Sequence, residues 1–251
     1  MPARIGGRQL ALAGTDALAH IFTMLKLTPI LLAVLYGLAM YVFSAWRTTR
    51  QLDARSTELA DARLRELSLD MAAALDLPTI KVNIYEIDPV NGLASPDGRI
   101  FITRGFYNKY RVGEVSAEEM ASVIAHELGH VALGHTKRRM IDFSGQNAMR
   151  VALGAVLSRI LPGAGVWIAN ALTSLLAARL SRQDEYEADA YASALLVKAG
   201  IGTGPQKSLF RKLDGLASGG APMPAWLMSH PRTEDRIAAI EAREAKWRIG
   251  G

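Results

Sequence analysis

The sequence predicts an α+β protein that is mostly helical, with a small β-sheet and a transmembrane helix near the N-terminus. Two segments, 116–131 and 181–197, carry the start and stop signals of helices, and the first also has an apolar stripe at helical spacing. Two shorter segments, 79–87 and 99–103, are rich in β-branched residues and are typical of strands. An almost uncharged run, 27–46, is about long enough to cross a bilayer.

The length and composition suit one domain of ordinary size with an N-terminal attachment. The chain has 251 residues, is half hydrophobic and carries a formal net charge of +5. Its basic residues do not form clusters interleaved with aromatic residues, so we expect no nucleic-acid partner. Arginines scattered near apolar segments suit an anionic membrane surface better. The absence of cysteine excludes disulfides and a thiol nucleophile.

The run 27–46 has the flanks of a membrane anchor. Arg47 follows it, and Tyr41 and Trp46 near one end are typical of residues at a membrane interface. A cleaved signal peptide would have an unusually long charged leader, and a buried core helix is the other alternative. We therefore expect residues 1–26 to form an N-terminal arm and 27–46 to form a single-pass anchor.

Residues 47–77 are expected to form one amphipathic helix that links this anchor to the sheet. Their apolar residues recur at near-helical spacing, at Leu52, Leu59, Leu67, Met71 and Leu75. More arginines follow the anchor than basic residues precede it, so the positive-inside rule favours a cytoplasmic position for the following domain. Interspersed acidic residues and the basic arm leave the other side of the membrane open.

Two predicted strands begin the folded domain. The segment 79–87 alternates, and the segment 99–103 follows a turn at 95–98 that contains both proline and glycine. We expect these strands to belong to a platform for the substrate, although a plain hairpin without that role would look the same in the sequence.

The pentapeptide His-Glu-Leu-Gly-His at 126–130 is the most informative feature of the chain. His126 and His130 are four residues apart, so on a helix they share a face and both imidazoles can bind one metal ion. Glu127 lies beside them, where it can deprotonate a water that the metal polarises. Two ordinary surface histidines at helical spacing are the alternative.

The helix that would carry this motif has recognisable ends. Ser116 can cap its start, with Glu119 three residues later as a capping box requires, and Gly134 can end it. Its apolar stripe indicates that the helix packs in the core, where a metal site should be, and this favours zinc binding over chance.

The third zinc ligand is expected in the segment 181–189. Because the chain has no cysteine, this ligand must be His, Asp or Glu, and a fourth position stays open for water. Ser181 can cap a helix that runs to about Val197, and on that helix Glu185 and Asp189 share a face. Spacing favours Glu185 as the ligand and Asp189 as a hydrogen-bond acceptor for a ligand histidine. A charged, solvated helix start is the alternative.

Two further candidates lie near the C-terminus, at His230 and Arg236. Thr233 can cap a helix, which places Arg236 in the first turn, where a positive charge is unfavourable against the helix dipole. A residue in such a position often has a specific anionic partner. The partner would be a substrate carbonyl that develops negative charge or a structural carboxylate. A proline-terminated loop with a surface salt bridge is the alternative.

An apolar stretch, 151–180, separates the two halves of the predicted site. A Pro-Gly-Ala-Gly segment at 162–165 breaks it, and neither half is long enough for a comfortable membrane span. We expect a pair of helices packed over the domain, forming an apolar lid across 149–180 that gates the site. A hairpin that dips into the membrane is the alternative.

In this order the motifs resemble those of metallopeptidase family 48, whose members are gluzincin endopeptidases of the HtpX-like, Oma-type and CAAX-prenyl-protease-like groups. The resemblance runs from about Leu77 to Trp247 and rests on Asn91–Ala94, Gly98–Gly105, the 126–130 motif, the 181–189 segment and Ser229–Pro231 with Arg236.

The resemblance implies a role for most of these residues. It makes Glu185 the third zinc ligand, places Asp189 behind a ligand, and puts His230 beside the metal, where it stabilises the reaction intermediate or caps the idle site. It also implies an edge strand that binds an extended peptide by strand addition. The residues of this strand are Asn91, Gly92, Leu93 and Ala94.

The expected function is therefore zinc-dependent hydrolysis of peptide bonds by a protease domain over 78–251. One Zn²⁺ per chain would be held by His126, His130 and Glu185, with Glu127 as the base and His230 or Arg236 on the oxyanion. The resemblance implies protein quality control at a bacterial inner membrane, with membrane or envelope proteins as substrates. A non-proteolytic zinc-binding chaperone or scaffold at the membrane is the alternative, but a scaffold needs no base.

Overall fold

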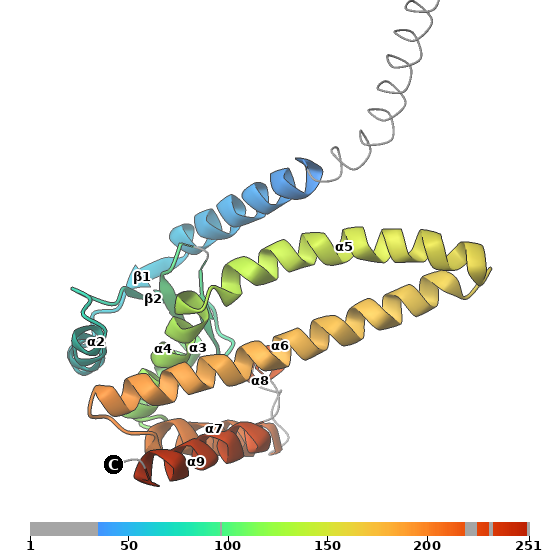
Figure 1. Cartoon of the computed structure of the whole chain (residues 1–251). Coiled ribbons are helices and arrows are strands. Elements are labelled where there is room, and N and C mark those ends of the chain that lie inside the picture. The colour runs from blue at the N-terminus through green and yellow to red at the C-terminus, as the bar shows by residue number, and fades with distance from the viewer. Residues whose placement is uncertain (1–34, 96, 219–224, 231–232, 250–251) are drawn as a thin grey trace, which may run out of the picture.

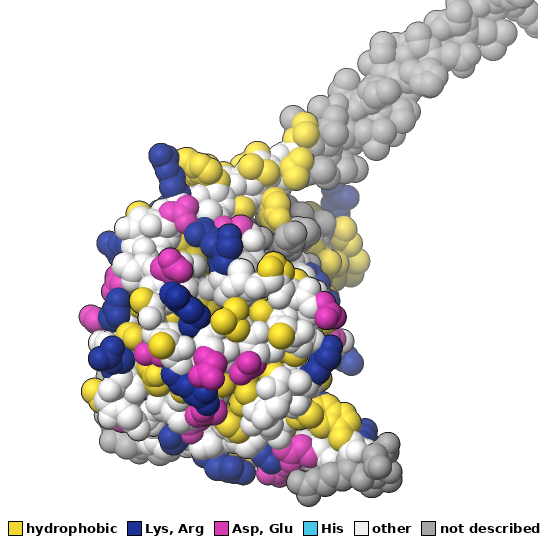
Figure 2. Space-filling model, turned by 90° about the vertical axis from the view of Figure 1, so that its left-hand side faces the viewer, with side chains coloured by type: hydrophobic (Ala, Val, Ile, Leu, Met, Phe, Trp, Pro, Cys, Tyr) yellow, Lys and Arg dark blue, Asp and Glu magenta, His cyan; other side chains and the backbone are white. Residues whose placement is uncertain are grey.

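The computed structural model describes residues 35–95, 97–218, 225–230 and 233–249. These residues form a helical body around a small sheet, and a long helical hairpin projects from the body (Figure 1). The mostly helical α+β class is therefore confirmed. On the face in Figure 2, basic and acidic side chains are interspersed.

The described part of the chain contains a sheet of four strands in the order β1-β2-β4-β3. The strands are β1 (Ser56–Glu58), β2 (Val82–Tyr85), β3 (Gly92–Ala94) and β4 (Ile100–Thr103). β2 and β4, which fall within the two predicted strand segments, run parallel with Ile84 opposite Ile102. β1 and β3 are antiparallel to their neighbours, so β3 lies at an edge of the sheet.

The predicted single helix over 47–77 is wrong, because a strand interrupts it. Residues 35–54 are helical, β1 follows, and a new helix, α2 (Ala62–Ala74), begins after Asp61. The Asp61 carboxylate accepts a hydrogen bond from the Leu64 backbone N–H at 3.0 Å, which fixes the start of α2. β1 instead pairs with β2, so its backbone hydrogen bonds are satisfied in the sheet.

Helix α4 (Ala117–Ala132) runs through the centre of the body and has both predicted ends. The Ser116 hydroxyl accepts a hydrogen bond from the Glu119 N–H at 3.1 Å, and the Glu119 carboxylate accepts one from the Ser116 N–H at 2.7 Å. Gly134 follows the helix with a left-handed φ of 71°. Three of its larger apolar side chains are fully buried, namely Met120, Val123 and Ile124. Burying each of them stabilises the folded state by about 1.5–3 kcal/mol relative to leaving it in water.

The projecting hairpin consists of α5 (His135–Ile160) and α6 (Gly165–Lys198). Ser181 does not cap a helix, because α6 begins sixteen residues earlier and passes through it. The reason is that the residues before Ser181 are mostly Ala and Leu, which continue a helix readily. α6 ends where predicted, with Gly200 in the left-handed region just beyond it.

The predicted packing of 149–180 over the domain is also wrong. The two helices contact each other, but their distal half extends away from the body (Figure 1). Several of its large apolar side chains are accordingly exposed, with Trp167 at 80% exposure.

The structure describes only part of the predicted membrane anchor, residues 35–46. Residues 27–34 of the anchor and the arm 1–26 lie outside the described residues. Within the described ranges, no helix combines the length and the apolar character that crossing a bilayer requires.

Helices α7 (Gly204–Ser218) and α9 (Thr233–Ile249) pack against each other below α4 and α6 (Figure 1). The short helix α8 (Ala225–Ser229) lies just behind α6 in this view, and α3 (Arg104–Arg111) contacts strands β2 and β4. The buried carboxylate of Glu119 joins α4 to α7, since it accepts hydrogen bonds from Ser208 at 2.7 Å and Lys212 at 2.8 Å. This arrangement holds the end of α8 and the start of α9 against the motif on α4.

Candidate metal centre

A close approach of two helices brings the two halves of the predicted site together. Gly129 in the middle of the motif faces Ala188 of α6, and a Cβ atom at Gly129 would lie 3.0 Å from the Ala188 carbonyl oxygen. Only glycine fits such a contact without displacement. The two helices can therefore approach closely enough for a carboxylate of α6 to reach the histidines of α4.

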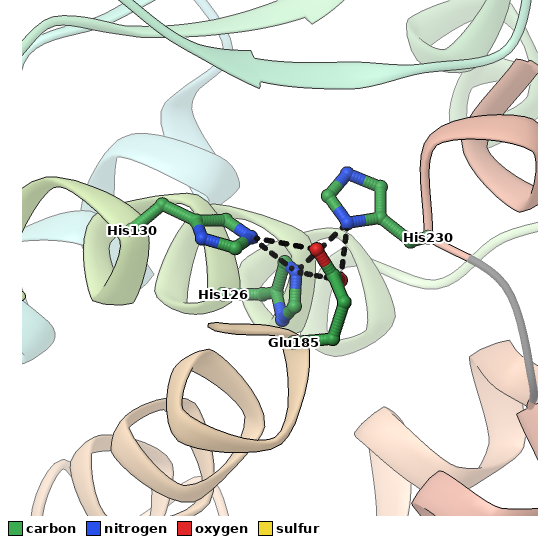
Figure 3. Close-up of side chains that lie close together, drawn as sticks. All are labelled: His126, His130, Glu185 and His230. Atoms are coloured by element: carbon green, nitrogen blue, oxygen red, sulfur yellow. Dashed lines mark hydrogen bonds and ion pairs between the residues drawn. The ribbon is translucent and has the colours of Figure 1, made fainter. Parts of the chain in front are cut away.

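Four side chains converge at this contact: His126 and His130 from α4, Glu185 from α6, and His230 from the segment after α8 (Figure 3). The Nε2 atoms of His126 and His130 are 3.1 Å apart. Glu185 places Oε2 3.4 Å from His126 Nε2 and Oε1 3.5 Å from His130 Nε2. His230 Nδ1 lies 3.3 Å from His126 Nε2 and 2.5 Å from Glu185 Oε2. All four residues are buried, so the cluster is shielded from solvent.

The donor set fits a zinc ion. With metal–ligand bonds of about 2.0–2.2 Å in a tetrahedron, two ligand atoms lie about 3.4 Å apart. The separations among His126, His130 and Glu185 are 3.1, 3.4 and 3.5 Å, close to that value. Imidazole nitrogens with a carboxylate oxygen are also the ligand types that zinc takes when cysteine is absent.

One ligand histidine has its tautomer fixed directly. His126 Nδ1 lies 2.9 Å from Asp189 Oδ1, and because a carboxylate only accepts, Nδ1 carries the proton. The Nε2 lone pair is then directed to the centre of the cluster. Asp189 comes from the same face of α6 as Glu185, one turn later, as the spacing predicts.

The electrostatics of the cluster favour a positive charge at its centre. Burial disfavours a charge on His126, but hydrogen bonds with Asp189 and Glu185 outweigh burial and raise its pKa to about 9. Burial also opposes ionisation of Glu185, yet the adjacent His126 and His230 hold its pKa well below the usual range. Burial lowers the pKa of His230 to about 4. Glu185 therefore stays ionised, and so does Asp189, whose pKa, despite burial, the adjacent Arg236 and His126 hold below its usual range. Both carboxylates attract a cation, and a bound metal ion would supply that charge.

The predicted base lies at the edge of the cluster. Glu127 is buried, and its Oε1 is 3.6 Å from Nε2 of His230. The edge strand β3 passes close above it, because a Cβ atom at Gly92 would lie 3.3 Å from Glu127 Oε1. The structure thus brings the edge segment, Glu127 and His230 together around one point.

Arg236 lies behind the cluster rather than in it. Its Nε donates to Asp189 Oδ2 at 2.6 Å and its Nη2 donates to Asp189 Oδ1 at 2.8 Å, with both side chains buried. The guanidinium also stacks over Phe210 at 4.3 Å from the ring centre. The sequence left two possible partners for Arg236, a substrate carbonyl and a structural carboxylate, and in the structure its partner is the carboxylate of Asp189. This places Arg236 as a support for Asp189 and, through it, for His126.

Sequence reasoning missed Trp226 and gave no role to His135. Trp226 of α8 stacks on His230 with ring centres 4.2 Å apart and meets His126 edge-on at 5.2 Å. A lone tryptophan carries no sequence signal for such a contact. His135 lies within hydrogen-bonding distance of His130, and its spacing of five residues from His130 was the available signal.

Comparisons with known proteins agree with this geometry. A family model described as Peptidase family M48 matches residues 58–244. The chain is 31% identical to the metalloprotease LoiP of Escherichia coli (strain K12), over 65% of this chain and 62% of LoiP. It is 27% identical to the metalloprotease YcaL of the same strain, over 73% of this chain and 69% of YcaL.

A longer relative matches as well. The chain is 30% identical to the Beta-barrel assembly-enhancing protease of Escherichia coli O157:H7, over 64% of this chain and 34% of that protein. The chain thus spans less than two thirds of LoiP and about one third of this relative. The family model covers well over half of the chain and includes all four residues of the metal cluster. On this evidence, the chain belongs to peptidase family M48.

Proposed function

We propose that this protein is a zinc-dependent endopeptidase in which His126, His130 and Glu185 bind the metal ion. The observation that carries the proposal is the convergence of their three donor atoms at separations of 3.1–3.5 Å, in a buried cluster with Glu127 beside it. When bound, zinc supplies Lewis-acid polarisation of a water and of the scissile carbonyl.

The chain's own residues move the protons. Glu127 accepts a proton from the attacking water and passes it to the leaving nitrogen, since it is the carboxylate next to both the ligands and the edge strand. Asp189 keeps Nδ1 of His126 protonated and so directs Nε2 to the metal. Arg236 neutralises Asp189. His230, which lies beside the donor atoms of His126 and Glu185, would donate to the developing oxyanion.

Substrate binding is proposed at the edge strand. The segment Asn91 to Ala94 includes β3, which is hydrogen-bonded to β4 on one side only among the described residues and passes above Glu127. An extended peptide that adds to this edge would present its backbone to the base with little demand on its sequence. Proteins and peptides in extended conformation are therefore the proposed substrates.

Replacing Glu185 by Ala is expected to reduce bound zinc from about one ion per chain to a small fraction of that, because a tetrahedral site loses one of its three protein ligands. Glu187→Ala on the same helix should retain far more zinc, because Glu187 contacts His135 and contributes no donor atom to the cluster, so its loss can weaken zinc binding only indirectly. Metal analysis of the two purified full-length variants, with casein hydrolysis measured in parallel, checks this. Equal zinc loss in both variants would contradict the ligand assignment, and a wild-type chain without zinc-dependent hydrolysis would contradict the function.

A membrane setting is proposed on separate grounds. The sequence has the apolar run 27–46, and the hairpin exposes Ile160, Trp167 and Leu175 at its distal half. Between 149 and 183 there are four arginines and no acidic residue, which suits contact with an anionic bilayer surface. We therefore propose an arm over 1–26, a single-pass anchor over 27–46 in a bacterial inner membrane, and a protease domain over 78–251.

The proposed task is quality control of membrane or envelope proteins, and the longer relative is named for the assembly of β-barrels. The proposed side of the membrane is the cytoplasm, because more arginines follow the predicted anchor than basic residues precede it. A green fluorescent protein fused to the C-terminus is expected to fluoresce, because it folds in the cytoplasm and not after export. Alkaline phosphatase at the same position should be inactive. An active phosphatase fusion would place the domain on the opposite side.

A further inference from the structure

We infer that His135 is a positioning residue for the metal centre, which fixes the tautomer and the orientation of His130 through a direct bond between the two imidazoles. The inference rests on the proposed role of His130 as a metal ligand. It adds a second support to the site, separate from the one that Asp189 gives to His126.

The contacts form a chain from α6 to the cluster. His135 is completely buried, and its Nδ1 lies 3.0 Å from Nδ1 of His130. Its other nitrogen, Nε2, lies 3.1 Å from Oε2 of Glu187 and 3.7 Å from Oδ1 of Asp184. His135 thus bridges a pair of carboxylates and a ligand histidine.

The positions of the protons follow from these partners. Carboxylates only accept, so Nε2 of His135 carries the proton and Nδ1 presents a lone pair. The facing Nδ1 of His130 must then be the donor. This leaves the lone pair of His130 on Nε2, the atom that lies 3.1 Å from His126 Nε2 in the cluster. With the opposite tautomer, His130 would present a proton to the metal and could not bind it.

The local fold explains why His135 occupies this place. Gly134 adopts a left-handed conformation, φ 71°, which turns the chain sharply between α4 and α5. His135 is the first residue of α5, and the turn folds its ring back onto His130, with ring centres 5.2 Å apart. Asp184 and Glu187 are three residues apart on α6, so they share the face that meets His135.

An alternative role for these residues is to bind a second cation. The ligand atoms of His135, Asp184 and Glu187 lie within 4.8 Å of one another. Two observations favour the positioning role. Nδ1 of His135 is directed to His130, and Nη2 of Arg138 lies 3.5 Å from Oδ1 of Asp184, where it already supplies positive charge. The number of zinc ions per chain separates the two roles.

Three substitutions at position 135 test the inference through zinc affinity. In His135→Asn the amide Oδ1 stands where Nδ1 stood and still accepts from His130, so most of the affinity should remain. His135→Gln is polar but places its amide near the former Nε2, and His135→Leu has no acceptor. Both should weaken zinc binding about 10–100-fold, the usual effect of losing a partner of a ligand histidine.

The measurements are the zinc dissociation constant, by competition with a chromophoric chelator, and the visible spectrum of the cobalt-substituted full-length protein. The expected order of affinity is wild type, then Asn, then Gln and Leu together, with a changed cobalt spectrum only in the last two. Thermal unfolding of the metal-free variants reports folding separately. If the Leu variant does not fold, the comparison of Asn with Gln decides alone.

Three outcomes would overturn the inference: unchanged affinity in the Gln variant, equal losses in the Asn and Gln variants, or two zinc ions in the wild type of which the Leu variant loses one. A failure of the proposed function looks different, because the wild-type chain itself would then bind no zinc. Glu187→Gln keeps an acceptor for His135 and should lose less affinity than Glu187→Leu, which provides an independent check on α6.

Discussion

Replacing Glu127 by Gln is expected to lower the turnover number for peptide hydrolysis about 10²–10⁴-fold, the usual contribution of a general base. The amide has the shape of the carboxylate but cannot take a proton from water. Zinc should remain bound, because Glu127 lies beside the cluster of donor atoms and is not one of them. A loss of activity with metal retained is the signature of a base, and not of a ligand.

The measurement is casein hydrolysis at saturating substrate, with zinc content determined on the same samples. Glu118→Gln is a matched control, since Glu118 is a partly exposed carboxylate on the same helix, paired with Arg63. It should leave the turnover number unchanged. A Glu127→Gln protein that binds zinc and keeps full activity would rule out the protease and leave the chaperone or scaffold reading. The inactive, zinc-loaded variant would also retain substrates, which can be recovered from membranes and identified.

The sequence was most reliable where a local signal decides the structure. The ends of α4 follow from the Ser116–Glu119 capping box and from Gly134, and both involve contacts within a few residues. The shared face of Glu185 and Asp189 follows from helical spacing alone, and it holds although the start of α6 was misplaced. A face depends on spacing within the helix, whereas a start depends on what precedes it.

The sequence-based predictions were wrong or incomplete where contacts between residues distant in the sequence determine the structure. Residues 56–58 leave the helical pattern because β2 offers them a strand to pair with, and no residue nearby signals this. The apolar segment 149–180 was expected to pack on the body, but the distal half of the hairpin extends away from it and leaves large apolar side chains exposed. Arg236 was recognised as electrostatically misplaced, yet only the fold shows that Asp189, forty-seven residues earlier, is its partner.

The same buried pair gives the largest expected effect on stability. Arg236→Leu should lower the free energy of unfolding by about 3–5 kcal/mol, because it leaves the carboxylate of Asp189 buried without its cation. Arg211→Leu is the matched control, since Arg211 pairs with Glu241 on the surface and should contribute at most about 1 kcal/mol. Urea unfolding of the metal-free proteins measures both, so that zinc binding does not add to the result.

The double variant Asp189→Asn with Arg236→Leu separates the two roles of this pair. Asn at position 189 is neutral, so the buried charge disappears and most of the lost stability should return. Its amide oxygen can still accept from Nδ1 of His126, so the ligand tautomer is kept and zinc should bind more tightly than in Arg236→Leu alone. If the double variant is no more stable than the single one, the loss does not come from an unpaired carboxylate. Arg236 would then act through its packing on Phe210, and not through Asp189.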